Sequence, residues 1–412
     1  MLEVSIMFDC SEERKISAYK PQRARLLTIR RWYVCGAVLA CSLIILLSGC
    51  SLFATPSQSG TASPGVTPEA TKVITPTPNY KPPTITLTVS NCPTLSFSWD
   101  SLIGAKAGVD KVQTVTCGSL EGPGSLTALV GARYYTPDAK LDIYVYDNLN
   151  GNPTKRFSVQ GLLNGDVKVS PSNTIMTAEA TPGNSTPTLP NLFKEYQWNG
   201  TSFTQVLFPG IFPDMTSYQA HQSQAMVNAN MPNEGWRTSG FGVLDMLTRR
   251  VFHWPQTRDQ VVTFSTKNNV YIVESFNLGA GGGGVVATLF HLDNRPNTIF
   301  EIKQLTSIDG GLTVNTPAAG TQLTSPISAS ANYTANSGIL VRVVLYDNIF
   351  FAFEDTGAIH GSASSGAVTF TQLVPYQLDS KGLREGVVAF YATNQNNISL
   401  SNDVVLVKVF FS

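Results

Sequence analysis

The stretches REGVVAFYATNQ (residues 384–395) and DVVLVKVFFS (residues 403–412) decide the fold of the C-terminal part of the chain. Valine and aromatic side chains dominate both, and such residues favour strands. Working towards the N-terminus, GILVRVVLYDNI (338–349), FFAFEDTGAI (350–359) and AVTFTQLVPYQL (367–378) have the same character and are separated by turn residues. These short strands predict a β-sandwich over residues 309–412.

Two helices and a strand meander are predicted over residues 211–308. Met215 to Asn228 forms the first helix, with Asp214 as its N-cap. Gly240 to Trp254 forms the second, which Pro255 ends. Its predicted apolar face consists of Phe241, Leu244, Leu247, Val251 and Trp254. Four strand-like runs follow, namely VVTFSTK, NVYIVESFNL, GVVATLFHLD and IFEIKQL. This order resembles a cystatin-like or nuclear-transport-factor-like α+β roll.

Residues 84–210 predict an antiparallel β domain. Runs such as TITLTVS, LDIYVYDNL and KEYQWNG alternate apolar with polar side chains and are separated by Gly, Pro and Asn. Asn199-Gly200 predicts a tight hairpin turn. The predicted fold class is therefore mainly β and multi-domain, with this domain, the α+β roll and the C-terminal sandwich in sequence order.

The first 49 residues have the pattern of a signal peptide. Residues 1–34 carry seven basic and four acidic side chains, and an apolar run from Tyr33 to Leu47 follows. The run ends in Leu47-Ser48-Gly49-Cys50, which resembles the lipobox of bacterial lipoproteins. The resemblance implies cleavage before Cys50 and lipidation of its thiol. An uncleaved N-terminal anchor, with Cys50 incidental, is the alternative.

Residues 50–83 are rich in Pro, Ser and Thr and cannot bury a core, so they predict a tether. At about 3.1 Å per residue, it would reach at most about 100 Å. The expected location is the outer face of the bacterial cytoplasmic membrane, where lipid chains on Cys50 hold the protein. A cell-wall polymer or a surface protein is a further possible partner.

The charge balance argues against nucleic acid as a partner. The chain has 28 basic and 28 acidic residues, whereas nucleic-acid-binding domains carry a basic excess. The four histidines, His221, His253, His291 and His360, lie far apart in the sequence without an HxxH or HExxH motif. We therefore predict no metal site and no cofactor.

Cys92 and Cys117 are the two cysteines that follow Cys50. An oxidising exterior favours a disulfide between them, and two separate thiols are the alternative.

The first predicted helix has an unusually polar face. Tyr218, His221, Gln222 and Ala225 share it, and Trp236 follows in the next loop. Tyr218, Gln222 and Trp236 are therefore candidate ligand-binding residues in a cavity of the roll. The alternative is a seam between domains in which these side chains bond to other parts of the protein.

Two resemblances add to this interpretation. NTPAAGTQLTSP (315–326), the VRVVLYD strand and EGVVAFYATNQ resemble the immunoglobulin-like domain of bacterial spore-germination proteins. The chain departs from it at Ala329-Ser330-Ala331, where that domain often has a glycine. The resemblance implies an extracellular interaction or spacer module without catalytic residues. The run from Lys194 to Asn228 resembles uncharacterised lipoproteins of Gram-positive-type bacteria.

Together these features predict a non-catalytic cell-surface lipoprotein that acts as an extracellular binding module, not an enzyme. A lipoprotein that binds a small molecule in the central roll is the first alternative. A cell-wall hydrolase is the second, and it requires two carboxylates facing each other across an open cleft.

Overall fold

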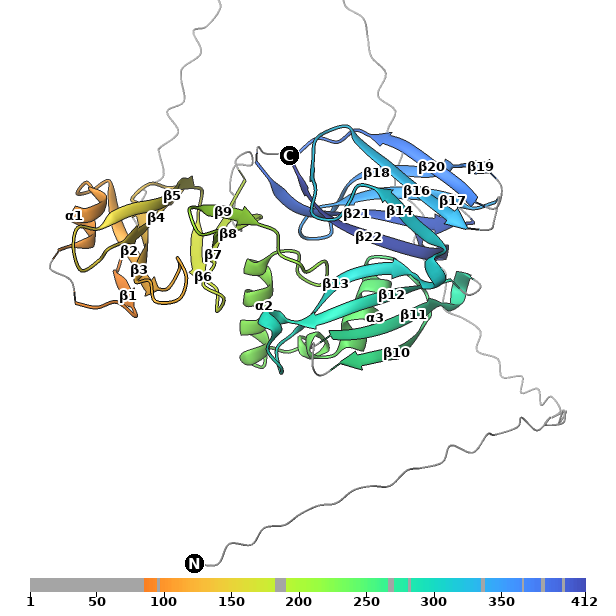
Figure 1. Cartoon of the computed structure of the whole chain (residues 1–412), viewed down its shortest axis with the longest axis horizontal. Helices are drawn as coiled ribbons and strands as arrows, with labels where there is room; N and C mark the ends of the chain where they lie inside the picture. The colour runs from red at the N-terminus through yellow and green to blue at the C-terminus, as the bar shows by residue number, and fades with distance from the viewer. Residues whose placement is uncertain are drawn as a thin grey trace, which may run out of the picture. The chain divides into compact units, whose positions relative to one another are not determined.

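The computed structural model describes residues 85–412 except 95–96, 182–189, 266–269, 281–282, 335–337, 365–366, 379–381 and 395–396. The predicted signal peptide (1–49) and tether (50–83) lie outside the described residues. The chain is mainly β and is built from several largely antiparallel sheets (Figure 1). The predicted fold class, mainly β and multi-domain, is confirmed.

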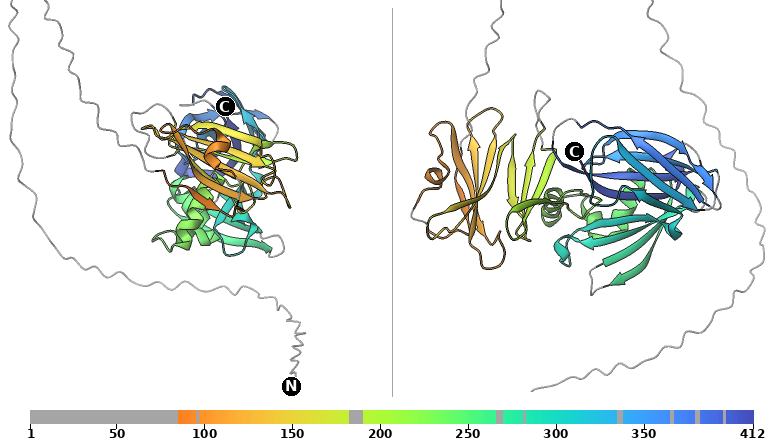
Figure 2. Two further views of the ribbon diagram at one scale, coloured as in Figure 1. Left: turned by 90° about the vertical axis from the view of Figure 1, so that its left-hand side faces the viewer. Right: turned by 45° about the horizontal axis from the view of Figure 1, so that its top comes forward.

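Two sheets pack face to face in the N-terminal part of the described chain (Figure 2, right). The first contains β1 (Thr88–Ser90), β2 (Asp110–Gly118), β3 (Thr127–Tyr134), β4 (Leu141–Asp147) and β5 (Thr154–Leu162) in that order. The second contains β6 (Asp166–Val169), β7 (Ile175–Glu179), β8 (Leu192–Trp198) and β9 (Phe203–Val206). Their shared core includes Leu129, Ile143 and Phe203.

The outer face of the first sheet has a smaller core of its own. Helix α1 (Trp99–Ile103) contributes Trp99, which packs with Val115 and Val130. A disulfide joins Cys92 to Cys117 of β2, with the two Cα atoms 4.9 Å apart. The segment before α1 is thereby tied to the sheet.

A nine-stranded sheet runs through the rest of the chain. Its path is β10 (Thr257–Ser265), β11 (Val270–Asn277), β12 (Gly284–His291), β13 (Phe300–Ser307), β22 (Ser401–Phe411), β21 (Arg384–Thr393), β17 (Leu340–Tyr346) and β18 (Ala352–His360). The ninth strand, β15 (Gln322–Leu323), pairs with β22. The predicted roll (211–308) and sandwich (309–412) therefore share one sheet, joined at the Leu305–Leu406 pair.

A four-stranded sheet covers one face of the C-terminal strands. It consists of β14 (Leu312–Thr316), β16 (Ile327–Thr334), β20 (Ala367–Val374) and β19 (Ser362–Ser364). Alternate residues of β21 point to opposite faces. Val388 and Phe390 belong to the core between the two sheets, whereas Val387 and Tyr391 belong to the core under the helices. Burial on both faces explains why β21 is almost continuously apolar.

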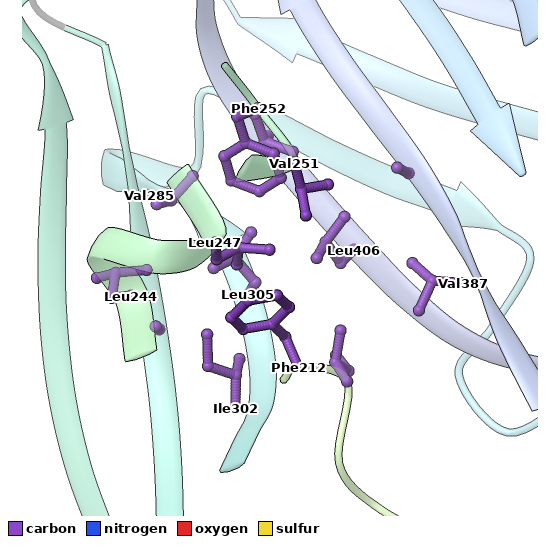
Figure 3. Close-up of a cluster of buried hydrophobic side chains, with 14 of the residues drawn as sticks. Phe212, Leu244, Leu247, Val251, Phe252, Val285, Ile302, Leu305, Val387 and Leu406 are labelled. Atoms are coloured by element: carbon purple, nitrogen blue, oxygen red, sulfur yellow. The ribbon is translucent and has the colours of Figure 1, made fainter. Parts of the chain in front are cut away.

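Helix α3 (Gly240–Arg250) lies over the other face of the nine-stranded sheet (Figure 3). Leu244, Leu247 and Val251 of the predicted apolar face are buried there, but Phe241 is 41% exposed. Helix α2 (Ser217–Asn228) begins after Thr216, whose hydroxyl accepts from the Gln219 amide. Thr216, not Asp214, is therefore the N-cap. The short helices are η1 (Gly235–Thr238), η2 (Leu278–Ala280), η3 (Leu292–Asn294), η4 (Ile308–Gly310) and η5 (Ile398–Leu400).

Candidate functional site

The linker between β9 and α2 is fixed to the nine-stranded sheet. Its Ile211 amide donates to the Ile302 carbonyl at 2.6 Å, and the Ile302 amide donates to the Phe212 carbonyl at 2.7 Å. The side chain of Phe212 lies among Ile302 and Leu305 (Figure 3). The linker thus holds an aromatic ring at the edge of the helix-covered core.

A buried ion pair between Lys408 and Glu385 also contacts this linker. Lys408 Nζ lies 2.9 Å from Glu385 Oε2, and Lys408 also donates to the carbonyls of Gly210 (2.9 Å) and Met215. Burial raises the pKa of Glu385 to about 7 against the opposing charge of Lys408. Burial likewise lowers the pKa of Lys408. The lysine therefore links β22 to both ends of the segment that carries Phe212.

The turn between β17 and β18 holds a second aromatic ring. Asp347 Oδ1 accepts from the amides of Ile349 (3.0 Å) and Phe351 (2.8 Å). Gln219 of α2 donates to the Asn348 carbonyl at 3.0 Å. Phe350 has a φ of 58°, in a region that bulky residues rarely adopt. The Asp347 carboxylate within the turn and Gln219 from outside it therefore fix the backbone that carries Phe350.

Helix η1 carries the third ring, Trp236. Because residue 242 of α3 is a glycine, the backbone of η1 can approach α3 closely. A Cβ atom at Gly242 would lie 2.6 Å from the Trp236 carbonyl oxygen. Trp236 packs on Phe212, with ring centroids 6.3 Å apart, and Phe212 packs on Phe350, with centroids 5.3 Å apart. Segments distant in the sequence thus meet in one aromatic group.

This aromatic group borders a cavity of about 520 Å³. The cavity is lined by the linker, η1, the end of α3, β17, β18, their turn and η5. Its lining residues are Phe212, Pro213, Trp236, Arg237, Arg250, Val251, His253, Val344, Tyr346, Ile349, Phe350, Ala352, Asp355 and Ile398. A volume of this size, lined by aromatic and aliphatic side chains together with Arg, His and Asp, is in the range of small-molecule sites.

A buried carboxyl pair lies next to one cavity residue. Asp214 Oδ2 accepts from Arg237 at 2.7 Å, and the Asp214 amide donates to Glu301 at 3.3 Å. Complete burial, together with the Asp214 charge, raises the pKa of Glu301 well above its ordinary value. The pair fixes Arg237 and does not line the cavity.

The three predicted ligand-binding residues do not come together. Trp236 lines the cavity, but Tyr218 and Gln222 do not. Tyr218 is buried in a seam with the second sheet, where it stacks on Phe193 and donates to Asp166. Gln222 is exposed. Two residues of the polar face of α2 therefore bond to other parts of the chain, Tyr218 to the second sheet and His221 to Asp293 of η3 at 3.2 Å.

Sequence reasoning missed Phe212, Tyr346, Phe350 and Arg250 as cavity residues. Phe212 and Phe350 lie 138 positions apart in the numbering, and no periodicity relates them. One available signal was the run IFF at residues 349–351, because three apolar residues in a hairpin turn are unusual.

Comparison of the sequence with protein-family models and with curated proteins finds no match. Among the described residues, no cluster of three or more His, Cys, Asp or Glu side chains has an arrangement suited to a metal ion. None of the helices in this part of the chain has the length and apolar character needed to cross a bilayer.

Proposed function

We propose that this chain is an exported, lipid-anchored protein that binds a small molecule outside the cell in the cavity beside Trp236. In this proposal the mature chain begins at Cys50, and the segment 50–83 holds the folded part away from the membrane. The basic segment, the apolar run and the Leu47-Ser48-Gly49-Cys50 box support this proposed location at the membrane surface.

One observation carries the binding role. Three rings from three segments, Phe212, Trp236 and Phe350, border a cavity of about 520 Å³. Aromatic side chains that are held in place this way bind a planar or apolar ligand at little cost in conformational entropy. His253, with a φ of 55°, lies at the same cavity as Phe350. Such backbone strain is often concentrated at ligand sites.

The carboxyl pair favours binding over hydrolysis. Asp214 and Glu301 are 7% and 0% exposed, so substrate has no access to them. A glycosidase needs two carboxyl groups that flank the substrate in a cleft. The proposed activity is therefore binding without turnover.

Metabolic lipid labelling of cells tests whether Cys50 is lipidated. Cells that express the full chain are fed an alkyne analogue of palmitate, and label on the protein is measured. We expect label on the wild type and on a Cys41→Ala control, and none on Cys50→Ala. Equal labelling of the wild type and Cys50→Ala contradicts the proposal.

Saturation-transfer NMR tests the binding site. A panel of one- and two-ring acids, amines and neutral compounds is screened against the full chain, the Trp236→Ala variant and a Trp198→Ala control in β8. We expect several ring compounds to bind the wild type and the control but not Trp236→Ala. If no compound binds, or if binding survives in Trp236→Ala, the cavity is not the site.

A partner protein or wall polymer is the second candidate. Ile349 and Phe351 are 63% and 65% exposed at the β17–β18 turn, and exposed apolar groups of this kind mark interaction surfaces. The double variant Ile349→Ser and Phe351→Ser should then sediment less with purified cell walls than the wild type does. Equal sedimentation removes this candidate.

A further inference from the structure

The charged side chains that line the cavity differ in whether they are paired within the protein. Arg237 donates to Asp214 and Glu234, each at 2.7 Å. Asp355 accepts from Arg342 Nε at 2.7 Å and also from its Nη2. Although partial burial of Asp355 favours the neutral acid, these bonds hold its pKa below the ordinary value. Both of these lining groups already have an opposite charge beside them.

Two basic lining groups have no such partner. Neither Arg250, the last residue of α3, nor His253 forms an ion pair with any of the residues that the structure describes. The neighbouring Arg249 differs, because it pairs with Asp245 at 2.6 Å and does not line the cavity. The solvent-exposed Arg250 therefore places one unpaired positive charge at the cavity, with the exposed His253 imidazole also in its lining.

Aromatic and aliphatic side chains make up most of the other lining residues. Phe212, Trp236 and Phe350 border the cavity, and the lining residue Val344 is 1% exposed. The Tyr346 hydroxyl bonds to that of Tyr391 at 2.9 Å, inside the protein. These side chains can accept a flat apolar body, although the Arg237 guanidinium lies over the Trp236 ring, 4.7 Å from its centroid, and Asp355 also lines the cavity.

From this division we infer that the cavity selects a small organic anion with a planar ring body. The rings lie against Trp236 and Phe350, and the acid group meets the Arg250 guanidinium and the His253 imidazole. A guanidinium binds carboxylate, sulfonate or phosphate oxygens through charge-assisted hydrogen bonds. The inference rests on the proposed function, because it names the ligand class for the same site.

Two fluorescent probes test the selection. 8-Anilino-1-naphthalenesulfonate and N-phenyl-1-naphthylamine share the same ring body, but only the first is an anion. Each is titrated into the full chain at low salt. We expect the anion to bind about tenfold more tightly, the order of one charge-assisted hydrogen bond.

Arg250→Gln should remove most of this preference, because it should weaken binding of the anion much more than binding of the neutral probe. Arg249→Gln is the matched control and should keep the preference. Equal affinity of the two probes, or the same loss in both variants, overturns the inference. If both probes bind and Trp236→Ala weakens both, the binding site survives even where the anion preference fails. If neither probe depends on Trp236, the proposed function fails instead.

Discussion

Replacing Lys408 by Met should destabilise the protein strongly and in a pH-dependent way. The change removes the charge that opposes burial of Glu385, and it leaves the carbonyls of Gly210 and Met215 without their donor. Breaking a buried ion pair by removing one partner costs about 3 to 5 kcal/mol. Because these bonds hold the linker that carries Phe212, the cavity should also bind its ligand more weakly.

The pH dependence follows from the pKa of Glu385. This pKa is about 7 with Lys408 present, and it rises further when the lysine is removed. A carboxyl whose pKa is raised on folding contributes stability at low pH, and this contribution is lost as pH rises through the folded-state value. The loss caused by Lys408→Met should therefore be smaller at pH 5.5 than at pH 8.5.

Urea denaturation, followed by tryptophan fluorescence, measures these differences. The double variant with Glu385→Gln supplies the control, because a neutral Gln leaves no uncompensated charge. In that background the cost of Lys408→Met should fall by about 2 kcal/mol or more. A cost below about 1 kcal/mol at pH 8.5, or the same cost in both backgrounds, refutes the reasoning.

Three further changes have definite expected outcomes. Glu301→Gln replaces a carboxyl whose pKa is raised in the folded protein, so the difference in free energy of unfolding between this variant and the wild type should increase in favour of the variant as pH rises above 5, by up to about 1.4 kcal/mol per pH unit. Urea curves at pH 5 and pH 8 measure this difference, and the same difference at both pH values contradicts the prediction. Gly242→Ala should destabilise the protein and weaken probe binding, because the added Cβ meets the Trp236 backbone, even though Ala is more favourable than Gly in a helix by about 1 kcal/mol. A higher melting temperature with unchanged probe binding contradicts this prediction. Cys92→Ala with Cys117→Ala should lower the free energy of unfolding by about 3 kcal/mol, and an intact mass that reductant leaves unchanged in the wild type would show that no bridge exists.

Local patterns predicted most of the secondary structure. The runs VVTFSTK to IFEIKQL correspond to β10–β13, and the run from Gly240 contains α3. These elements have their own periodicity, which a linear sequence displays directly. The hairpin at Asn199 was predicted in the right place, but its turn spans Asn199 to Ser202, where the Asn199 side chain accepts from two amides of the turn.

Contacts between distant strands were beyond the same reasoning. A boundary was expected between the roll and the sandwich, yet the two share a sheet through the Leu305–Leu406 pair. The near-continuous apolar run of β21 was a signal, because such strands are covered on both faces. Similarly, Glu385 and Lys408 lie in largely apolar strands that also carry Arg384 and Asp403, and which of these charges form a pair depends on the strand register in the tertiary structure.

Fluorine NMR of the full chain labelled with 5-fluorotryptophan tests the central claim most directly. The protein has five tryptophans, and the Trp236 resonance is identified by its loss in Trp236→Phe. On addition of 8-anilino-1-naphthalenesulfonate, the account predicts that this resonance shifts while those of Trp99 in α1 and Trp198 in β8 stay in place. A bound probe that leaves Trp236 unshifted, or that shifts Trp198 instead, contradicts it.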